Sequence, residues 1–218
     1  MSRPVAILFD WDNTLVDSWA CIQQAMNATL TAMGHPVWDL DETKRRVALS
    51  MKDSFPTLFG ARWPQARDIF YDTFASIHLN FLDPLPGAAD TLRRLHSADI
   101  PLGVISNKAG RFLRKEAESL GWKGYFRHLA GAGDAAADKP SDLPVRQALD
   151  AIGVAADHNV WFIGDAAIDM ECASNAGVFP VLVKHDAWRE GEFDRHPPAR
   201  HFQSWSAFGL YLDEILVP

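Results

Sequence analysis

The chain has 218 residues, enough for one or two domains at roughly 150 residues each. Its composition, 48% hydrophobic and 22% charged, argues against intrinsic disorder, and its net charge of −7 argues against a nucleic-acid-binding surface. No apolar stretch approaches the ~18 residues of a membrane span. The apolar run near the start is too short for a signal peptide, and the two cysteines lack metal-binding or redox spacing. We therefore expect a cytoplasmic protein without membrane or nucleic-acid partners.

Short all-apolar runs alternate with helical patterns along most of the chain. Such runs are expected for parallel strands that are buried on both faces, and they lie at residues 5–9, 101–105, 126–130, 160–163 and 178–183. Helical patterns over residues 112–120 and 145–152 are followed by Gly121 and Gly153, each placed where a helix C-cap belongs. The alternation predicts an α/β fold with a doubly wound parallel sheet.

Residues 17–83 interrupt this alternation, since they show helical patterns and no convincing strand. Apolar residues recur at helical spacing over 19–33 and 70–81, and a shorter helix is expected at about 41–48. The insertion follows the first strand at its carboxyl end, where open α/β sheets bind ligands. We therefore predict an α/β core domain of residues 1–16 and 84–218, and an inserted all-helical cap domain of residues 17–83.

Polar clusters follow four of the predicted strands. Taken singly each is a weak signal, because Asp-x-Asp and Ser-Asn pairs more often cap turns and helices. Together they gather carboxylates at one sheet edge, where mutual repulsion is relieved only by a cation or by protonation. Hard oxygen ligands of this kind suit Mg²⁺. The clusters are Asp10 with Asp12, Ser106-Asn107-Lys108, Lys139-Pro140, and Gly164-Asp165 with Asp169.

These residues, in this order, resemble the motifs of the haloacid dehalogenase-like (HAD) hydrolase superfamily along essentially the whole chain. The stretch Asp10-Trp11-Asp12-Asn13-Thr14 carries the first motif, and the other clusters match the later ones. Pro86-Gly87 before a helix with Leu92 and Leu95, and Asn107-Lys108 after the next strand, are most similar to the phosphoglycolate phosphatase-like branch with a helical cap. Asn13 stands where many members have glycine, and we expect no consequence because asparagine tolerates a positive φ.

The resemblance implies a Rossmann-like core and a Mg²⁺-dependent phosphatase that acts on a small phosphorylated metabolite. Asp10 is then the nucleophile that forms an aspartyl-phosphate, and Asp12 is the general acid and base. Asp10 and Asp165 are expected to bind Mg²⁺ through their carboxylates and Asp12 through its main-chain carbonyl. Asp169 is expected to bind the metal directly or through water.

The same resemblance assigns the remaining matched residues to the phosphate. Lys139 is implied to neutralise charge on the phosphoryl group and the nucleophile, as a catalytic residue. Ser106 and Asn107 are expected to bind phosphoryl oxygens. Thr14 is placed with this phosphate-binding set because it is expected to orient the Asp10 loop.

Two further lysines are candidates for substrate contacts. Lys108 either contacts the phosphate or a substrate carboxylate, or lies at a solvated helix start. Lys52 lies in the segment 48–54 between the cap helices, where caps of this type carry a specificity loop. We select Lys52 for a substrate-anion contact, although a surface lysine is the more common reading of such a residue.

Three alternatives to a phosphatase are open at this point. A phosphomutase would keep the same catalytic set. A dehalogenase-type activity would need neither Mg²⁺ nor an acid two residues after the nucleophile, so Asp12, Asp165 and Lys139 argue against it. A catalytically idle binding or regulatory homologue would normally have lost a catalytic carboxylate, and none is missing here. By resemblance, 2-phosphoglycolate is the first substrate candidate; the sequence does not determine the substrate or the oligomeric state.

Overall fold

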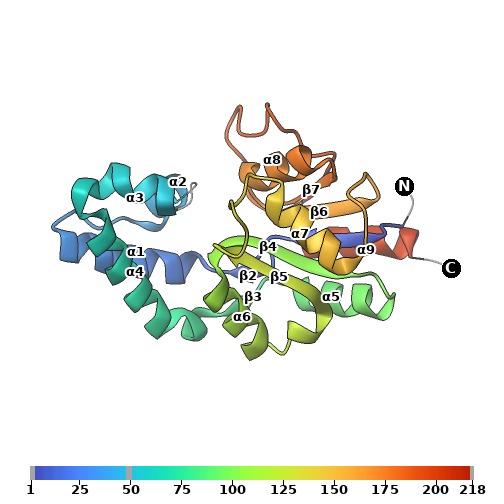
Figure 1. The fold of residues 1–218 in the computed structure, drawn as a ribbon, viewed down its shortest axis with the longest axis horizontal. Coiled ribbons are helices and arrows are strands. Elements are labelled where there is room, and N and C mark those ends of the chain that lie inside the picture. Colours follow the sequence, from blue (N-terminus) through green and yellow to red (C-terminus); the bar gives the residue numbers. More distant parts are fainter. Residues whose placement is uncertain (1–2, 48–50, 217–218) are drawn as a thin grey trace. The chain divides into compact units, whose positions relative to one another are not determined.

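The computed structural model describes residues 3–47 and 51–216, with the side chains of Lys52 and Asp53 outside the described part. The chain divides into two compact units, an α/β unit of residues 1–16 and 84–218 and a helical unit of residues 17–83 (Figure 1). At the two crossings between the units, β2 (Val16–Asp17) and β3 (Asp83–Pro84) pair as a two-stranded sheet. Within the described ranges, a search for helices long and apolar enough to cross a bilayer finds none.

The α/β unit is built on a six-stranded parallel sheet of order β5-β4-β1-β6-β7-β8. This is a doubly wound order, in which the strand sequence changes direction beside β1. Phe9 of β1 pairs with Val104 on one side and Ile163 on the other, so β1 is central. The fold class predicted from the sequence is thereby confirmed. The strands are β1 (Ala6–Phe9), β4 (Leu102–Ala109), β5 (Phe126–Ala132), β6 (Val160–Gly164), β7 (Phe179–Val183) and β8 (Arg200–Phe202).

Helices cover both faces of this sheet (Figure 1). Leu8 belongs to one buried cluster with Leu149 of α7 and Ala173 of α8. The ring of the next residue, Phe9, lies 6.0 Å from the ring of Trp205 on α9. Successive side chains of a strand point to opposite faces, which explains why the central strand β1 is apolar and buried at every position. The helices are α5 (Ala88–Ser97), α6 (Gly110–Ser119), α7 (Leu143–Ile152), α8 (Ala167–Ala176) and α9 (Trp205–Ile215).

The helical unit has its own apolar core. Met26 and Leu30, one turn apart on α1, share a buried cluster with Phe55 and Phe59 of α3. Gly34 ends α1 in the left-handed region, with φ 80°, as a C-cap glycine does. The elements are α1 (Trp19–Met33), α2 (Leu40–Arg46), α3 (Met51–Phe59) and α4 (Trp63–Ile77), with 3₁₀ turns η1 (Gly60–Arg62) and η2 (His78–Phe81). The role of this unit as a cap remains a prediction.

Four elements differ from the sequence-based expectation. Helix α3 was expected to be part of a loop over 48–54, but it begins at Met51; residues 48–50 lie outside the described ranges. Strand β4 was expected to end at Ile105, but it continues to Ala109, with an irregular register against β5 beyond Ile105. Strand β8 and helix α9 were not predicted from the sequence. The expectation that Ser106 follows the strand is therefore wrong, because Ser106 lies within it.

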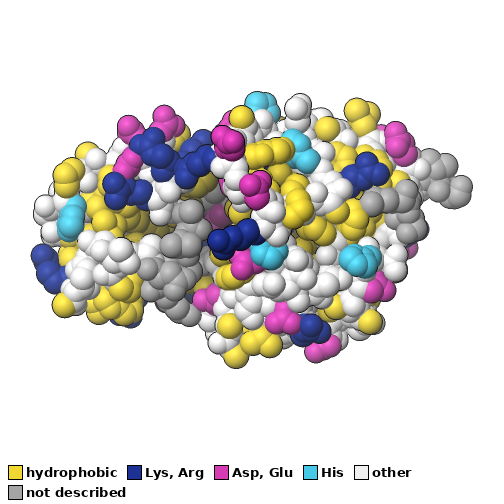
Figure 2. All heavy atoms as spheres, turned by 90° about the horizontal axis from the view of Figure 1, so that it is seen from above, with side chains coloured by type: hydrophobic (Ala, Val, Ile, Leu, Met, Phe, Trp, Pro, Cys, Tyr) yellow, Lys and Arg dark blue, Asp and Glu magenta, His cyan; other side chains and the backbone are white. Residues whose placement is uncertain are grey.

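Several charged surface residues form local ion pairs. Glu42 in α2 pairs with Arg45 and Arg46, whose side chains are more than half exposed, and Arg114 of α6 lies 2.6 Å from Asp134. On the face that Figure 2 shows, Lys and Arg side chains lie among Asp and Glu. Basic charge on this face is therefore balanced locally and does not form the stripe typical of nucleic-acid binding.

Candidate active site

The turn that follows β1 presents the first two carboxylates. The main-chain N–H of Asp10 donates to the Ile163 carbonyl on β6 (2.8 Å), which extends the sheet by one residue. The N–H groups of Leu15 and Val16 then donate to the Trp11 carbonyl (2.9 and 3.2 Å) and close the turn. Asn13 within it has a φ of 60°, a conformation that asparagine tolerates better than most side chains. Asp10 is thus held by the main chain at the carboxyl edge of the sheet.

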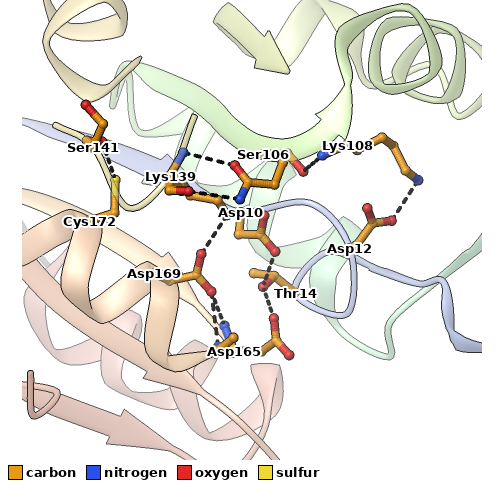
Figure 3. A network of polar contacts seen from close by, with 12 residues as sticks. Asp10, Asp12, Thr14, Ser106, Lys108, Lys139, Ser141, Asp165, Asp169 and Cys172 are labelled. Atoms are coloured by element: carbon orange, nitrogen blue, oxygen red, sulfur yellow. Dashed lines mark hydrogen bonds and ion pairs between the residues drawn. The ribbon is translucent and has the colours of Figure 1, made fainter. Parts of the chain in front are cut away.

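Lys139 is a buried cation beside Asp10 (Figure 3). Its Nζ lies 2.6 Å from Asp10 Oδ1 and 2.6 Å from Asp169 Oδ1. Burial disfavours the ammonium ion, but the attraction of Asp10 and Asp169 outweighs it and raises the pKa of Lys139. Asn107 anchors the main chain of Lys139, because its Nδ2 donates to the Lys139 carbonyl (3.1 Å) and its Oδ1 accepts from the Lys139 N–H (3.0 Å).

The Thr14 hydroxyl connects two of the carboxylates. Its Oγ1 lies 3.2 Å from Asp10 Oδ2 and 3.0 Å from Asp165 Oδ1. One hydroxyl hydrogen can be donated to only one of these two carboxylates at a time, so Asp10 and Asp165 share a single donor at this point. Trp205 of α9 supports the same turn by donating from Nε1 to the Thr14 carbonyl (2.8 Å).

Asp169 lies at the amino end of α8. Its Oδ2 accepts from the main-chain N–H groups of Asp165 (3.2 Å) and Ala166 (3.1 Å), where the helix favours negative charge. Gly164 allows this approach, because a Cβ there would come within 2.4 Å of the Asp169 side chain. The glycine at the end of β6 is therefore required by the packing of Asp169, and is not only part of a sequence motif.

Asp10, Asp165 and Asp169 each offer an oxygen, and these oxygens all lie within 4.8 Å of one another. Burial raises the pKa of Asp10 to about 6, with Lys139 opposing this shift and Asp169 adding to it. Burial and the neighbouring Asp169 and Asp10 carboxylates raise the pKa of Asp165 to about 8. This cluster of three acids and one ammonium has a surplus of negative charge in hard oxygen ligands, which fits Mg²⁺.

A second lysine, Lys108, lies near Asp12 (Figure 3). Its Nζ is 2.7 Å from Asp12 Oδ1 and 2.6 Å from Glu116 Oε2, and its side chain is 5% exposed. Trp11 Nε1 donates to the same Glu116 Oε2 (2.7 Å). Burial disfavours the charge of Lys108, but the two carboxylates reverse this effect and raise its pKa. The alternative of a solvated helix start is therefore wrong for Lys108.

Two of the predicted phosphate-binding residues, Ser106 and Asn107, make side-chain contacts with the main chain of the protein. Ser106 is buried, and its Oγ accepts the main-chain N–H of Lys108 (3.2 Å). The side-chain amide of Asn107 contacts the main chain of Lys139, a role that the sequence did not suggest. Phosphate binding by Ser106, Asn107 and Thr14 stays a prediction. The Lys52 side chain lies outside the described part of the chain.

Two charged residues next to the site were missed in the sequence. Glu116 had a usable signal, because it is a carboxylate on the apolar face of its helix, four residues after Phe112 and three after Leu113. Lys184, one residue beyond β7, donates from Nζ to the main-chain carbonyl of Asp165 (3.1 Å). No pattern around Lys184 marked it, since its contact depends on how β7 pairs with β6.

The comparisons with known proteins agree with this geometry. A family model described as haloacid dehalogenase-like hydrolase matches residues 7–183. The phosphoglycolate phosphatase of Rhodospirillum rubrum is 33% identical over 199 residues, which cover 86% of this chain and 82% of that protein. That of Chromobacterium violaceum is 28% identical over 191 residues, 82% of this chain and 84% of the relative.

Among solved structures, a haloacid dehalogenase-like family hydrolase from Streptococcus pneumoniae has the same fold. It matches with a TM-score of 0.85 over 96% of this chain and 98% of its own, at 23% identity. Since the family model covers most of the chain and the motifs follow the family's order, the chain belongs to the haloacid dehalogenase-like hydrolases.

Proposed function

We propose that this protein is a Mg²⁺-dependent phosphatase that hydrolyses a small phosphate monoester through an aspartyl-phosphate on Asp10. The observation that carries the proposal is the cluster of Asp10, Lys139, Asp165 and Asp169, in which a carboxylate nucleophile lies beside a fixed cation and further oxygen ligands. The phosphoglycolate phosphatase relatives support a phosphate monoester as the substrate class.

The size of the barrier favours a site with several components. Enzymes accelerate phosphate monoester hydrolysis by up to ~10²¹-fold, which is roughly 29 kcal/mol. A hydrogen bond to a charged group contributes about 1.5–3 kcal/mol, so no single contact is sufficient. A covalent nucleophile, a fixed cation, an acid and base, and a metal each supply a part, and the described residues offer a candidate for each.

In the first half of the reaction, an Asp10 oxygen forms a bond to phosphorus while the phosphorus–ester oxygen bond breaks. Asp12 gives its carboxyl proton to the leaving alkoxide. Lys139 offsets the negative charge of Asp10 and of the phosphoryl group, and Ser106 donates to a phosphoryl oxygen. Thr14 keeps the Asp10 carboxylate oriented by its hydroxyl.

In the second half, Asp12 takes a proton from water as the water oxygen bonds to phosphorus. The bond from phosphorus to Asp10 breaks, which releases inorganic phosphate and restores the Asp10 carboxylate. Asp10, Asp165, Asp169 and the Asp12 carbonyl would hold Mg²⁺, which would supply charge neutralisation and Lewis acidity.

We take a small carboxylated phosphate, with 2-phosphoglycolate as the first candidate, to be the substrate. Lys139 and Lys108 both contact carboxylates of the chain itself, so a substrate carboxylate needs another cation. Lys52 remains our candidate for it from the sequence. An unchanged KM for 2-phosphoglycolate in a Lys52→Met variant would remove Lys52 from the proposal.

The proposal is tested by measuring phosphate release from a panel of phosphorylated metabolites and from para-nitrophenyl phosphate. We expect release that needs Mg²⁺, stops with a chelator and is lost in Asp10→Asn. The absence of release from every compound would contradict it. Transfer of a trapped phosphoryl group to a sugar phosphate, and not to water, would indicate a phosphomutase.

A further inference from the structure

Glu116 is a buried carboxylate in a place where its helix needs an apolar side chain. It lies on the face of α6 that also carries Phe112 and Leu113, and it is 1% exposed. Burying an ion pair costs desolvation, and an apolar side chain of similar volume often serves packing equally well or better. The charge of Glu116 therefore calls for a reason other than the packing of α6.

The contacts of Glu116 lead to the catalytic turn. Its Oε2 accepts from the indole Nε1 of Trp11 (2.7 Å) and contacts Lys108 Nζ (2.6 Å). Trp11 is the residue between Asp10 and Asp12, and Lys108 Nζ lies 2.7 Å from Asp12 Oδ1. One carboxylate oxygen thus fixes both a ring within the turn and the cation that touches the Asp12 carboxylate.

Neighbouring rings hold the indole in its place. The Trp11 ring is fully buried and meets the rings of Trp122 and Phe126 edge-on, at centroid distances of 5.9 and 6.4 Å. Trp122 follows α6 and Phe126 begins β5, so the ring is packed within the same unit as Glu116. The Trp11 ring is held by these neighbours and also donates to Glu116 of α6. It therefore couples the position of α6 to the turn that carries Asp10 and Asp12.

We propose that Glu116 and Lys108 are positioning residues that hold the Asp12 carboxylate where the leaving oxygen and the attacking water exchange protons. The inference rests on the proposed function, and it assigns Lys108 to Asp12 and not to a carboxylate of the substrate. Proton transfer depends on hydrogen-bond distance and direction, and small displacements of a catalytic group are costly. Loss of either positioning residue should therefore reduce turnover on every substrate.

The test compares four variants for kcat and KM on para-nitrophenyl phosphate and 2-phosphoglycolate, with thermal unfolding measured in parallel. Glu116→Gln keeps the shape and removes the charge, Lys108→Met removes the cation, and Lys108→Met with Glu116→Gln removes both charges. Glu118→Gln, on the exposed face of the same helix, is the matched control. We expect kcat to fall about 10–100-fold on both substrates in the first three variants, with little change in KM. Glu118→Gln should match the wild type.

The double variant separates positioning from stability. Because Lys108→Met leaves the buried Glu116 carboxylate without its cation and the double variant does not, we expect the double variant to unfold at a higher temperature than Lys108→Met while its kcat stays low. A kcat in the double variant close to that of the wild type would overturn the proposal, as would a rise in KM confined to 2-phosphoglycolate, which would make Lys108 a substrate ligand. A wild type inactive on all phosphates would instead overturn the proposed function, and this inference with it.

Discussion

Two lysine-centred clusters of the described site differ in what surrounds the ammonium. In the Lys139 cluster, one buried ammonium is shared by two carboxylates and a third carboxylate lies alongside, with a raised pKa for two of the three acids. In the Lys108 cluster, the ammonium is again shared by two carboxylates, but an indole N–H also donates to one of them. The first comprises Asp10, Lys139, Asp165 and Asp169, and the second comprises Trp11, Asp12, Lys108 and Glu116.

The difference separates a cluster suited to bind a ligand from a network that holds the Asp12 carboxylate in place. Crowded carboxylates with raised pKa values are unfavourable in the folded protein until a cation or protons arrive, so the Lys139 cluster is built for a ligand. The Lys108 cluster has a donor facing each carboxylate, and its geometry is complete within the chain. Changes in the two clusters should therefore affect activity and stability differently.

Removing the cation of the Lys139 cluster should have the largest effect. In Lys139→Met we expect kcat to fall at least about 10³-fold, because the nucleophile and the phosphoryl group lose their fixed charge. The free energy of unfolding should fall by about 3–5 kcal/mol without Mg²⁺, since buried carboxylates are left uncompensated. Steady-state kinetics and urea unfolding measure both effects, with exposed Lys115→Met as the control. A kcat within ten-fold of the wild type would contradict the role of Lys139.

Neutralising one acid in each cluster should shift stability in opposite directions. Without Mg²⁺, Asp165→Asn should raise Tm because it relieves the repulsion among the carboxylates, at about 2–4 °C per kcal/mol for a chain of this size. Glu116→Gln should lower the free energy of unfolding by about 1–3 kcal/mol, because it weakens a satisfied buried network. Differential scanning calorimetry in the presence of a chelator measures whether each variant is more or less stable than the wild type. If both substitutions raised stability, or both lowered it, the distinction between the two clusters would be wrong.

The stability of the metal-free protein should depend on pH through the Lys139 cluster. The pKa values of Asp10 and Asp165 rise from 3.8 in the unfolded chain to about 6 and about 8 in the folded one. Between these limits the folded state binds more protons than the unfolded state, so the contribution of these two acids to stability is complete below about pH 4 and is lost as the pH rises to about 8. Tm measured from pH 5 to 8 should fall, less steeply in Asp165→Asn. A slope that the substitution leaves unchanged would assign the dependence to other groups.

The Lys139 cluster could be predicted from the sequence because its acids follow apolar runs. Asp10 and Asp165 come directly after buried strands or within one residue of them, and parallel strands bring their carboxyl ends to one edge. The Lys108 cluster could be predicted only in part. Glu116 acquires its role from the face of α6 that meets the sheet, and a single sequence does not show which helix face meets which loop.

Strand β8 and helix α3, which have no apolar run, could not be predicted from the sequence for a related reason. Strand β8 has only three residues, Arg200–Phe202, and lies at the sheet edge, where one side needs no burial. In α3, Pro56 and polar neighbours interrupt the helical pattern, while Phe55 and Phe59 supply the contacts that stabilise the helix in the core of the helical unit. Tertiary packing determines that both elements form, and the spacing of apolar residues along the chain does not reveal such packing.

The smallest effect should come from substituting Cys172, which lies next to the Lys139 cluster. This substitution tests whether the thiol contributes to the net charge of the cluster. Burial raises the pKa of this thiol to about 12, and its Sγ donates to the Ser141 carbonyl at 3.2 Å, so it stays neutral at working pH. Because it adds no charge, Cys172→Ala should leave kcat and the Mg²⁺ dependence nearly unchanged, with about 1 kcal/mol of stability lost from the missing contact. Titrating activity against Mg²⁺ in both proteins measures this. A shifted Mg²⁺ requirement would mean that the thiol takes part as a thiolate, and that the surplus charge of the cluster is larger than its three carboxylates provide.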